Sequence, residues 1–185
     1  MGKPGERNES KSMSESATQR TIPAGIEIHR GYEPGLIGRV GELHGRYYAA
    51  AWGVGAGFEL MMTREFCDFV EHYDSKSDLL LSAHIDGVLA GSISILGNPG
   101  PEGAQLRFFL VDPRYHGRGA GKTLLNAALS WCRAHGIRKV FLWTVDHLPQ
   151  SRRLYEQAGF RVTMQCTDDR YTAPLESLKM ELTLD

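Results

Sequence analysis

The spacing of hydrophobic and polar residues predicts a strand followed by two helices in the first half of the chain. Residues 26–30 alternate apolar and polar side chains, which is typical of a half-buried strand. Apolar residues then recur every three to four positions from Leu36, until the glycine-rich stretch Gly53–Gly57 breaks the pattern. A second helical pattern covers 58–73, with Thr63 as a candidate cap of an internal start.

In the second half, the period changes to that of strands, which then alternate with helices. Asp86-Gly87 lies between two alternating runs and predicts a tight hairpin turn. The predicted elements are strands over 78–85, 88–96, 106–111, 139–145, 160–164 and 178–184, helices over 121–135 and 151–158, a C-terminal cap at Gly159, and a loop over 166–178. This order predicts an α/β fold in which an antiparallel meander leads into a βαβ unit.

Composition limits the class of protein. Residues 1–24 are polar and predict a disordered N-terminal tail, which leaves one domain over 25–185. A net charge of -1 argues against a nucleic-acid partner, and the sequence contains no apolar run long enough for a membrane span. The three cysteines are odd in number and form no Cys-x-x-Cys pair, which argues against a disulfide framework. Free cysteines of this kind predict a cytoplasmic protein. The seven histidines form no pair at helical spacing, so no metal site is predicted.

The stretch from Leu110 to Leu125 is the most informative part of the sequence, because an apolar strand passes through a glycine-rich loop into a helix. Gly117, Gly119 and Gly121 let backbone N–H groups point outward together, and the helix N-terminus adds a positive partial charge. Three basic residues lie nearby: Arg114, Arg118 and Lys122. The pattern predicts a cradle for a phosphate or pyrophosphate.

Three phosphate-binding patterns compete for this loop. Gly121-Lys-Thr123 matches the end of a nucleotide-triphosphate P-loop, but that pattern needs glycine at position 116, which is His116. The dinucleotide pattern Gly-x-Gly-x-x-Gly needs glycine at position 122, which is Lys122. The third pattern, a coenzyme A pyrophosphate loop, fits best.

Two motifs carry this fit. Val111-Asp-Pro-x-x-x-Gly-x-Gly-x-Gly121-x-x-Leu-Leu resembles the acyl-CoA pyrophosphate loop of the GNAT acetyltransferase superfamily, with His116 in place of the usual Gln or Arg. Leu154-Tyr-Glu-Gln-Ala-Gly-Phe160 is similar to a second motif of that family. The stretch 142–155 is most similar to acetyltransferase domains that are fused to winged-helix regulators, although no basic helix-turn-helix pattern precedes the first strand.

The resemblance implies a fold and a reaction. The fold is a mixed, mainly antiparallel sheet of six or seven strands with helices on both faces, in which strands 106–111 and 139–145 splay apart to hold the pantetheine arm. The co-substrate is acetyl-CoA, and the reaction is direct transfer of its acetyl group to a primary amine of a small molecule, amino acid or peptide in a ternary complex. A non-catalytic acyl-CoA-binding or regulatory module is the alternative.

The resemblance also assigns residues to roles. Tyr155 is the catalytic proton donor to the leaving thiolate. The implied acetyl-CoA-binding residues are Phe109, Leu110, Val111, His116, Gly117, Arg118, Gly119, Ala120, Gly121, Lys122, Thr123 and Ser151. Leu148 stands where the family often has Asn. The family often dimerises, so a homodimer is an expectation, for which the sequence identifies no interface.

Two questions stay open at the level of the sequence. The general base is Glu59, Asp146, His147 or a water molecule. A group of aromatic residues either lines an acceptor pocket or packs into the core: Tyr47, Tyr48, Trp52 and Phe58.

Overall fold

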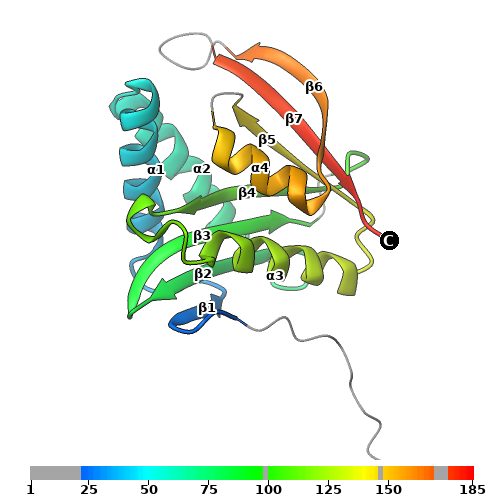
Figure 1. Cartoon of the computed structure of the whole chain (residues 1–185), viewed down its shortest axis with the longest axis horizontal. Helices are drawn as coiled ribbons and strands as arrows, with labels where there is room; N and C mark the ends of the chain where they lie inside the picture. The colour runs from blue at the N-terminus through cyan, green and yellow to red at the C-terminus, as the bar shows by residue number, and fades with distance from the viewer. Residues whose placement is uncertain (1–21, 98–99, 146–147, 169–174) are drawn as a thin grey trace, which may run out of the picture.

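The computed structural model describes residues 22–97, 100–145, 148–168 and 175–185, so the predicted tail falls almost entirely outside the described residues. They form one seven-stranded mixed sheet with helices on both faces (Figure 1), as predicted. The elements in chain order are β1 (Ile26–Arg30), α1 (Leu36–Trp52), α2 (Ala56–Glu71), β2 (Leu79–Ile85), β3 (Val88–Leu96), β4 (Ala104–Val111), a 3₁₀ turn (Pro113–Tyr115), α3 (Ala120–Ala134), β5 (Lys139–Val145), α4 (Pro149–Ala158), β6 (Arg161–Asp168) and β7 (Leu175–Thr183).

In the middle of the sheet, the parallel strands β4 and β5 pair over only a short length. The strand order is β1-β2-β3-β4-β5-β7-β6, and every neighbouring pair is antiparallel except β4 and β5. Those two strands pair only at Ala104 with Val140 and at Gln105 with Phe141 in the described part of the chain. Beyond these pairs β4 and β5 diverge, which confirms the predicted splay.

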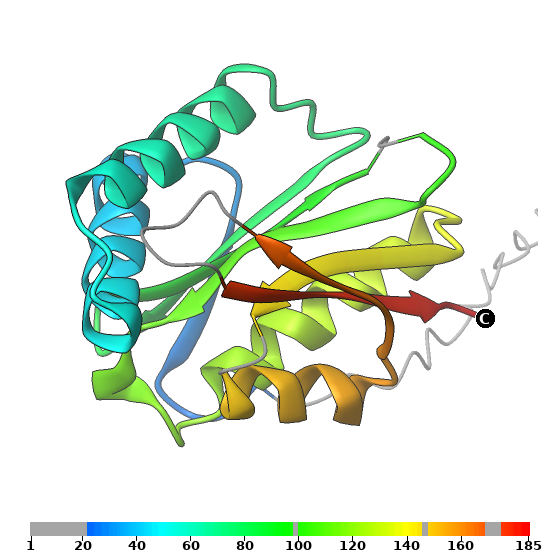
Figure 2. The same cartoon turned by 90° about the horizontal axis from the view of Figure 1, so that it is seen from above.

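The helices divide between the two faces of the sheet. Figure 2 shows α1 and α2 on one face and α3 and α4 on the other. The larger core lies beneath α3, which contributes the buried side chains of Leu124, Leu125, Ala128, Leu129 and Cys132. A smaller core, centred on Phe66 and Phe108, lies beneath α1 and α2. Among the described residues, no helix combines the length and the apolar character that crossing a membrane requires.

The contact between α1 and α2 corrects one local prediction. Helix α2 begins at Ala56, so the glycine-rich break is shorter than predicted, and Thr63 lies inside the helix instead of capping it. A Cβ atom placed on Gly41 would lie 2.6 Å from the Thr63 hydroxyl oxygen. Thr63 therefore faces a close approach between the two helices, which the spacing of apolar residues in one helix does not reveal.

The last two strands are longer than predicted. Strand β6 continues to Asp168 and β7 begins at Leu175, so most of the predicted loop 166–178 is sheet. Polar side chains extend this pairing, because Gln165 and Thr167 both donate hydrogen bonds to Glu176 across the strands, at 3.1 and 3.0 Å. A search for alternating apolar residues does not detect a ladder of this kind.

Candidate active site

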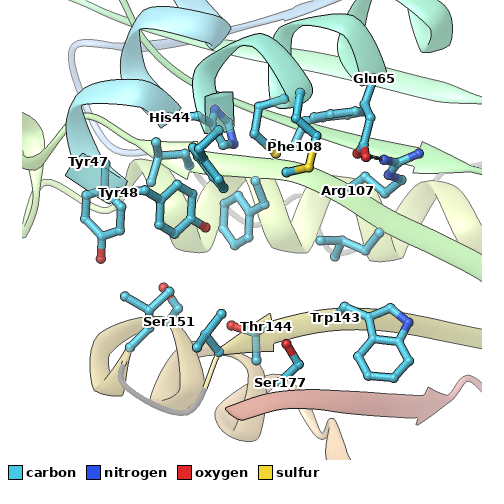
Figure 3. Close-up of a pocket in the computed structure, with 18 of the residues that line it drawn as sticks. His44, Tyr47, Tyr48, Glu65, Arg107, Phe108, Trp143, Thr144, Ser151 and Ser177 are labelled. Carbon is cyan, nitrogen blue, oxygen red and sulfur yellow. Dashed lines mark hydrogen bonds and ion pairs between the residues drawn. The ribbon is translucent and has the colours of Figure 1, made fainter. Parts of the chain in front are cut away.

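A pocket of about 480 Å³ opens where β4 and β5 diverge, beneath α1 and α2 (Figure 3). Its upper wall comes from the two helices and β4, and its lower wall from β5, α4, β6 and β7. The described residues that line it are His44, Tyr47, Tyr48, Trp52, Phe58, Met61, Met62, Glu65, Gln105, Leu106, Arg107, Phe108, Phe109, Leu110, Trp143, Thr144, Val145, Leu148, Ser151, Tyr155, Cys166 and Ser177.

Strand β4 carries a bulge where it borders the pocket. The pairing of β3 with β4 shifts between Ser92 and Ser94, and Phe108 takes a left-handed backbone conformation with φ of 48°. The Ser92 hydroxyl donates a 2.8 Å hydrogen bond to the Phe108 carbonyl and so fixes the bulge. A non-glycine residue in this conformation costs about 1–2 kcal/mol, and such strain concentrates at functional sites. The sequence pattern gave no signal for this feature.

Tyr155 lies at the junction of the two walls. Its side chain is buried, and its ring packs edge-on against Phe109 and Phe160 at centroid distances of 5.9 and 5.8 Å. Burial raises the pKa of the Tyr155 phenol well above its ordinary value, and the neighbouring Tyr48 and Tyr47 raise it further. The hydroxyl therefore keeps its proton at physiological pH, which suits a proton donor and excludes a role as base.

Aromatic side chains form the helix side of the pocket. Tyr48 stacks on Trp52 at 4.6 Å and meets Phe58 and Tyr47 edge-on at 4.9 and 5.2 Å. Figure 3 shows Tyr47 and Tyr48 facing Ser151 and Thr144 across the opening. All four aromatic residues line the pocket, and none is among the described members of the two core clusters.

His44 is a buried polar residue of the pocket that the sequence reasoning missed. Its Nδ1 atom lies 2.8 Å from the Val40 carbonyl, which can only accept a hydrogen bond, so Nδ1 carries the proton. Burial lowers the pKa of His44 to about 4, and the imidazole is neutral near pH 7. Nε2 is thus a hydrogen-bond acceptor. Its place one turn after Val40, on the buried face of α1, was the only available signal.

The candidate bases have different positions. Glu59 is exposed and is not among the described residues that line the pocket, because its carboxylate folds over Gly45 of α1. Asp146 and His147 lie outside the described residues. A carboxylate that does line the pocket is Glu65, which forms a 2.5 Å ion pair with Arg107 of β4.

The loop after β4 starts at a buried clamp. The Asp112 carboxylate accepts 2.6 Å hydrogen bonds from Arg39 of α1 and from Arg114, and its backbone N–H donates to Ala90 at 2.7 Å. Arg114, together with Arg39, holds the pKa of Asp112 well below its usual range, so the carboxylate stays ionised. The clamp joins the loop to the helix side of the pocket, which no local motif predicts.

The glycines of the loop adopt the conformations that an amide cradle needs. Gly117 and Gly119 have φ of 78° and 93°, which side chains disfavour, and Gly119 caps α3. The first helical hydrogen bond runs from the Thr123 N–H to the Gly119 carbonyl at 2.9 Å. The N–H groups of residues 120–122 precede it and have no acceptor within the helix, as at any helix N-terminus.

The side chains of the loop are mostly engaged within the protein. Arg114 pairs with Asp112, and Arg118 pairs with Asp86 at 2.7 Å, so both arginines near the loop have acidic partners. The His116 ring bonds the Val111 carbonyl at 2.8 Å, and the Thr123 hydroxyl donates to Gly119 at 3.0 Å. The Ala120 side chain is buried in the core, whereas Lys122 is exposed on the first turn of α3.

Residues 39–160 match the model of the acetyltransferase (GNAT) family. The chain therefore belongs to that family, and the predicted family and fold are confirmed.

Known proteins resemble it at low identity. Human N-acetylaspartate synthetase is 25% identical over 136 residues, which are 73% of this chain and 44% of that protein. Mycothiol acetyltransferase of Beutenbergia cavernae is 36% identical over 91 residues, 48% of this chain and 26% of that protein. The chain thus spans less than half the length of either relative.

Solved structures share the fold. The structure of yncA from Salmonella typhimurium with its cofactor acetyl-CoA has a TM-score of 0.69 at 18% identity, covering 87% of this chain and 95% of that one. Spermidine N-acetyltransferase of Vibrio cholerae, solved with CoA and spermine, has a TM-score of 0.65 at 17% identity, covering 86% and 96%.

Proposed function

We propose that this protein transfers the acetyl group of acetyl-CoA to a primary amine of a small molecule, amino acid or peptide. The observation that carries the proposal is one pocket that joins the β4–β5 opening to an aromatic wall and is also lined by the buried Tyr155. The pocket gives the thioester and the amine a common chamber, which direct transfer in a ternary complex requires.

Each wall has a separate task in this proposal. The amides of Gly117–Lys122 bind the pyrophosphate, and the opened edge of β4 at Phe109–Val111 holds the pantetheine arm, with Ser151 opposite. The amine nitrogen attacks the thioester carbonyl, the carbon–sulfur bond breaks, and Tyr155 protonates the departing thiolate. The aromatic wall packs against the amine substrate.

The loss of a proton from the attacking amine needs a base. His44 is neutral and buried in the pocket, so its Nε2 can accept a hydrogen bond from the N–H group of the amine substrate. A pKa of about 4 makes the imidazole a weak proton acceptor, which favours an orienting role for His44 and transfer of the amine proton to water.

The acceptor is best sought with an amine panel. One relative is named N-acetylaspartate synthetase, and one similar structure is a spermidine N-acetyltransferase. The panel therefore contains aspartate, spermidine, 2-phenylethylamine, a simple alkylamine and a peptide with a free N-terminus. Release of the CoA thiol is measured for each amine, and thermal shift with acetyl-CoA measures binding separately. We expect an acetyl-CoA-dependent stabilisation and thiol release with at least one amine.

The same two measurements separate the alternatives. Stabilisation by acetyl-CoA without turnover on any amine supports a non-catalytic acyl-CoA-binding module. Absence of both overturns the proposal. Cytoplasmic location and homodimerisation stay predictions from the sequence.

A further inference from the structure

A cluster of two histidines and a glutamate lies at the β1 edge of the sheet, and none of its members lines the pocket. His29 is on β1, His84 is on β2, and Glu33 is in the turn between β1 and α1. Their ligand atoms all lie within 4.8 Å of one another. The Glu33 carboxylate reaches His84 Nε2 at 2.8 Å with one oxygen and His29 Nδ1 at 3.3 Å with the other.

Sheet pairing brings these residues together. In the antiparallel register His29 lies opposite Ser82, while His84 lies opposite Glu27, so the two histidines are diagonal neighbours on one face. Their rings stack with centroids 4.3 Å apart. The prediction of no metal site rested on the lack of histidine pairs at helical spacing. That spacing does not reveal a pair formed across two strands.

The three side chains are a ligand set that zinc-class cations prefer. Two imidazole nitrogens and one carboxylate oxygen bind Zn²⁺ and similar divalent ions, with a further position for water. Outer partners are also present, since the Ser82 hydroxyl donates to Glu33, and a Glu27 carboxylate oxygen lies 3.7 Å from His29 Nε2. Carboxylates and hydroxyls in this position orient metal ligands and fix the histidine tautomer.

The chain already holds two of the ligands in place. The side chains of His84 and Glu33 are only 14% and 24% exposed, whereas that of His29 is 46% exposed at the rim. The Glu33 carboxylate accepts a hydrogen bond from Ser82 and lies 2.8 Å from His84 Nε2, which holds these two ligands together. A cation can reach them past the half-exposed His29 side chain.

We propose that His29, Glu33 and His84 bind one divalent transition-metal ion of the zinc class, with one ligand atom from each residue. The ion ties β1 and the turn before α1 to β2. None of its three ligands lines the pocket, so this proposal and the proposed acetyltransferase activity can be tested independently.

The test is calorimetric titration of the full chain with ZnCl₂, after chelator treatment and without a polyhistidine tag. We expect one site, and a loss of affinity of at least about 100-fold in His29→Gln and His84→Gln, because removing an outer partner alone costs about 10–100-fold. His29→Gln alters a half-exposed side chain, so the fold is retained. Cobalt(II) absorption gives a second readout, with a visible band in the wild type that both variants lose.

His72→Gln is the matched control. His72 caps the C-terminus of α2, and its exposed ring lies 3.4 Å from the exposed Asp68 carboxylate, so the pair offers an imidazole and a carboxylate without a second imidazole. Zinc affinity should be unchanged in this variant. The proposal is overturned if the wild type binds no stoichiometric Zn²⁺, if His29→Gln and His84→Gln bind as tightly as the wild type, or if His72→Gln weakens binding equally.

Discussion

The loop that follows β4 and the helix wall of the pocket are built in opposite ways. The loop is a single run of residues, 112–123, whose glycines and helix start are fixed by local backbone geometry. The pocket combines side chains from α1, α2, β4, β5, α4, β6 and β7. The loop offers backbone amides, whereas the wall offers mainly aromatic side chains. One site can thus depend on neighbouring residues while the other depends on packing between distant elements.

Tyr155 of α4 lies outside both regions, with its ring against Phe109 of β4, and its removal should give the largest effect. Tyr155→Phe keeps the ring that packs on Phe109 and removes the proton donor. We expect kcat to fall roughly 100-fold or more with unchanged acetyl-CoA affinity. Steady-state thiol release and calorimetry measure the two quantities. Tyr73→Phe is the control, because the buried Tyr73 hydroxyl has no partner within the described structure. Full activity of Tyr155→Phe would remove the proposed acid.

The wall carries a pH dependence through His44, which should alter stability. The folded protein lowers the pKa of His44 to about 4 from 6.5, so below pH 6.5 the unfolded chain takes up the proton first. The stability that the neutral His44 contributes is fully present above pH 6.5 and is lost progressively as the pH falls toward 4. From pH 7.5 to 5, His44 should lower the free energy of unfolding by about 2 kcal/mol.

Urea unfolding at both pH values checks this in the wild type and in His44→Asn. The variant should lose most of the difference, while His135→Gln, which alters an exposed histidine, should retain it. Equal pH dependence in the wild type and His44→Asn contradicts the expectation.

A change in the loop should affect the co-substrate and leave the wall intact. In Gly119→Val, the side chain meets a backbone with φ of 93°, and its Cβ lies 3.2 Å from Pro23. Strain of about 1–2 kcal/mol moves the amides, so acetyl-CoA affinity should fall about tenfold. Gly121→Ala is the control, because its Cβ makes only ordinary contacts, at 3.5 Å or more. Calorimetry decides, and equal affinities in both variants would refute the cradle.

A change in the wall should show the converse pattern. Phe58→Ala removes the edge-on contact with Tyr48, so kcat/KM for the acceptor should fall up to about tenfold while acetyl-CoA affinity is unchanged. Leu60→Ala on the same helix is the control, since Leu60 is exposed and is not among the described pocket residues. An acceptor kcat/KM equal to that of the wild type would show that the wall does not select the amine.

This contrast also explains what the sequence could and could not predict. The loop and the motif around Tyr155 are short patterns of neighbouring residues, so the sequence alone was enough to predict them. The bulge at Phe108 depends on pairing with Ser92, and the Asp112 clamp depends on Arg39. Contacts of this kind join residues far apart in the chain, and no local period records them.

The two residue pairs between β4 and β5 have one more consequence. The two halves of the sheet are joined by few backbone hydrogen bonds, and in the proposed function the pantetheine arm pairs with the part of β4 that β5 leaves open. Folding and occupancy are then thermodynamically linked, and a co-substrate at 100 times its Kd adds about 2.7 kcal/mol to the folded state. The lifetime of the protein in a cell should therefore follow the supply of acetyl-CoA.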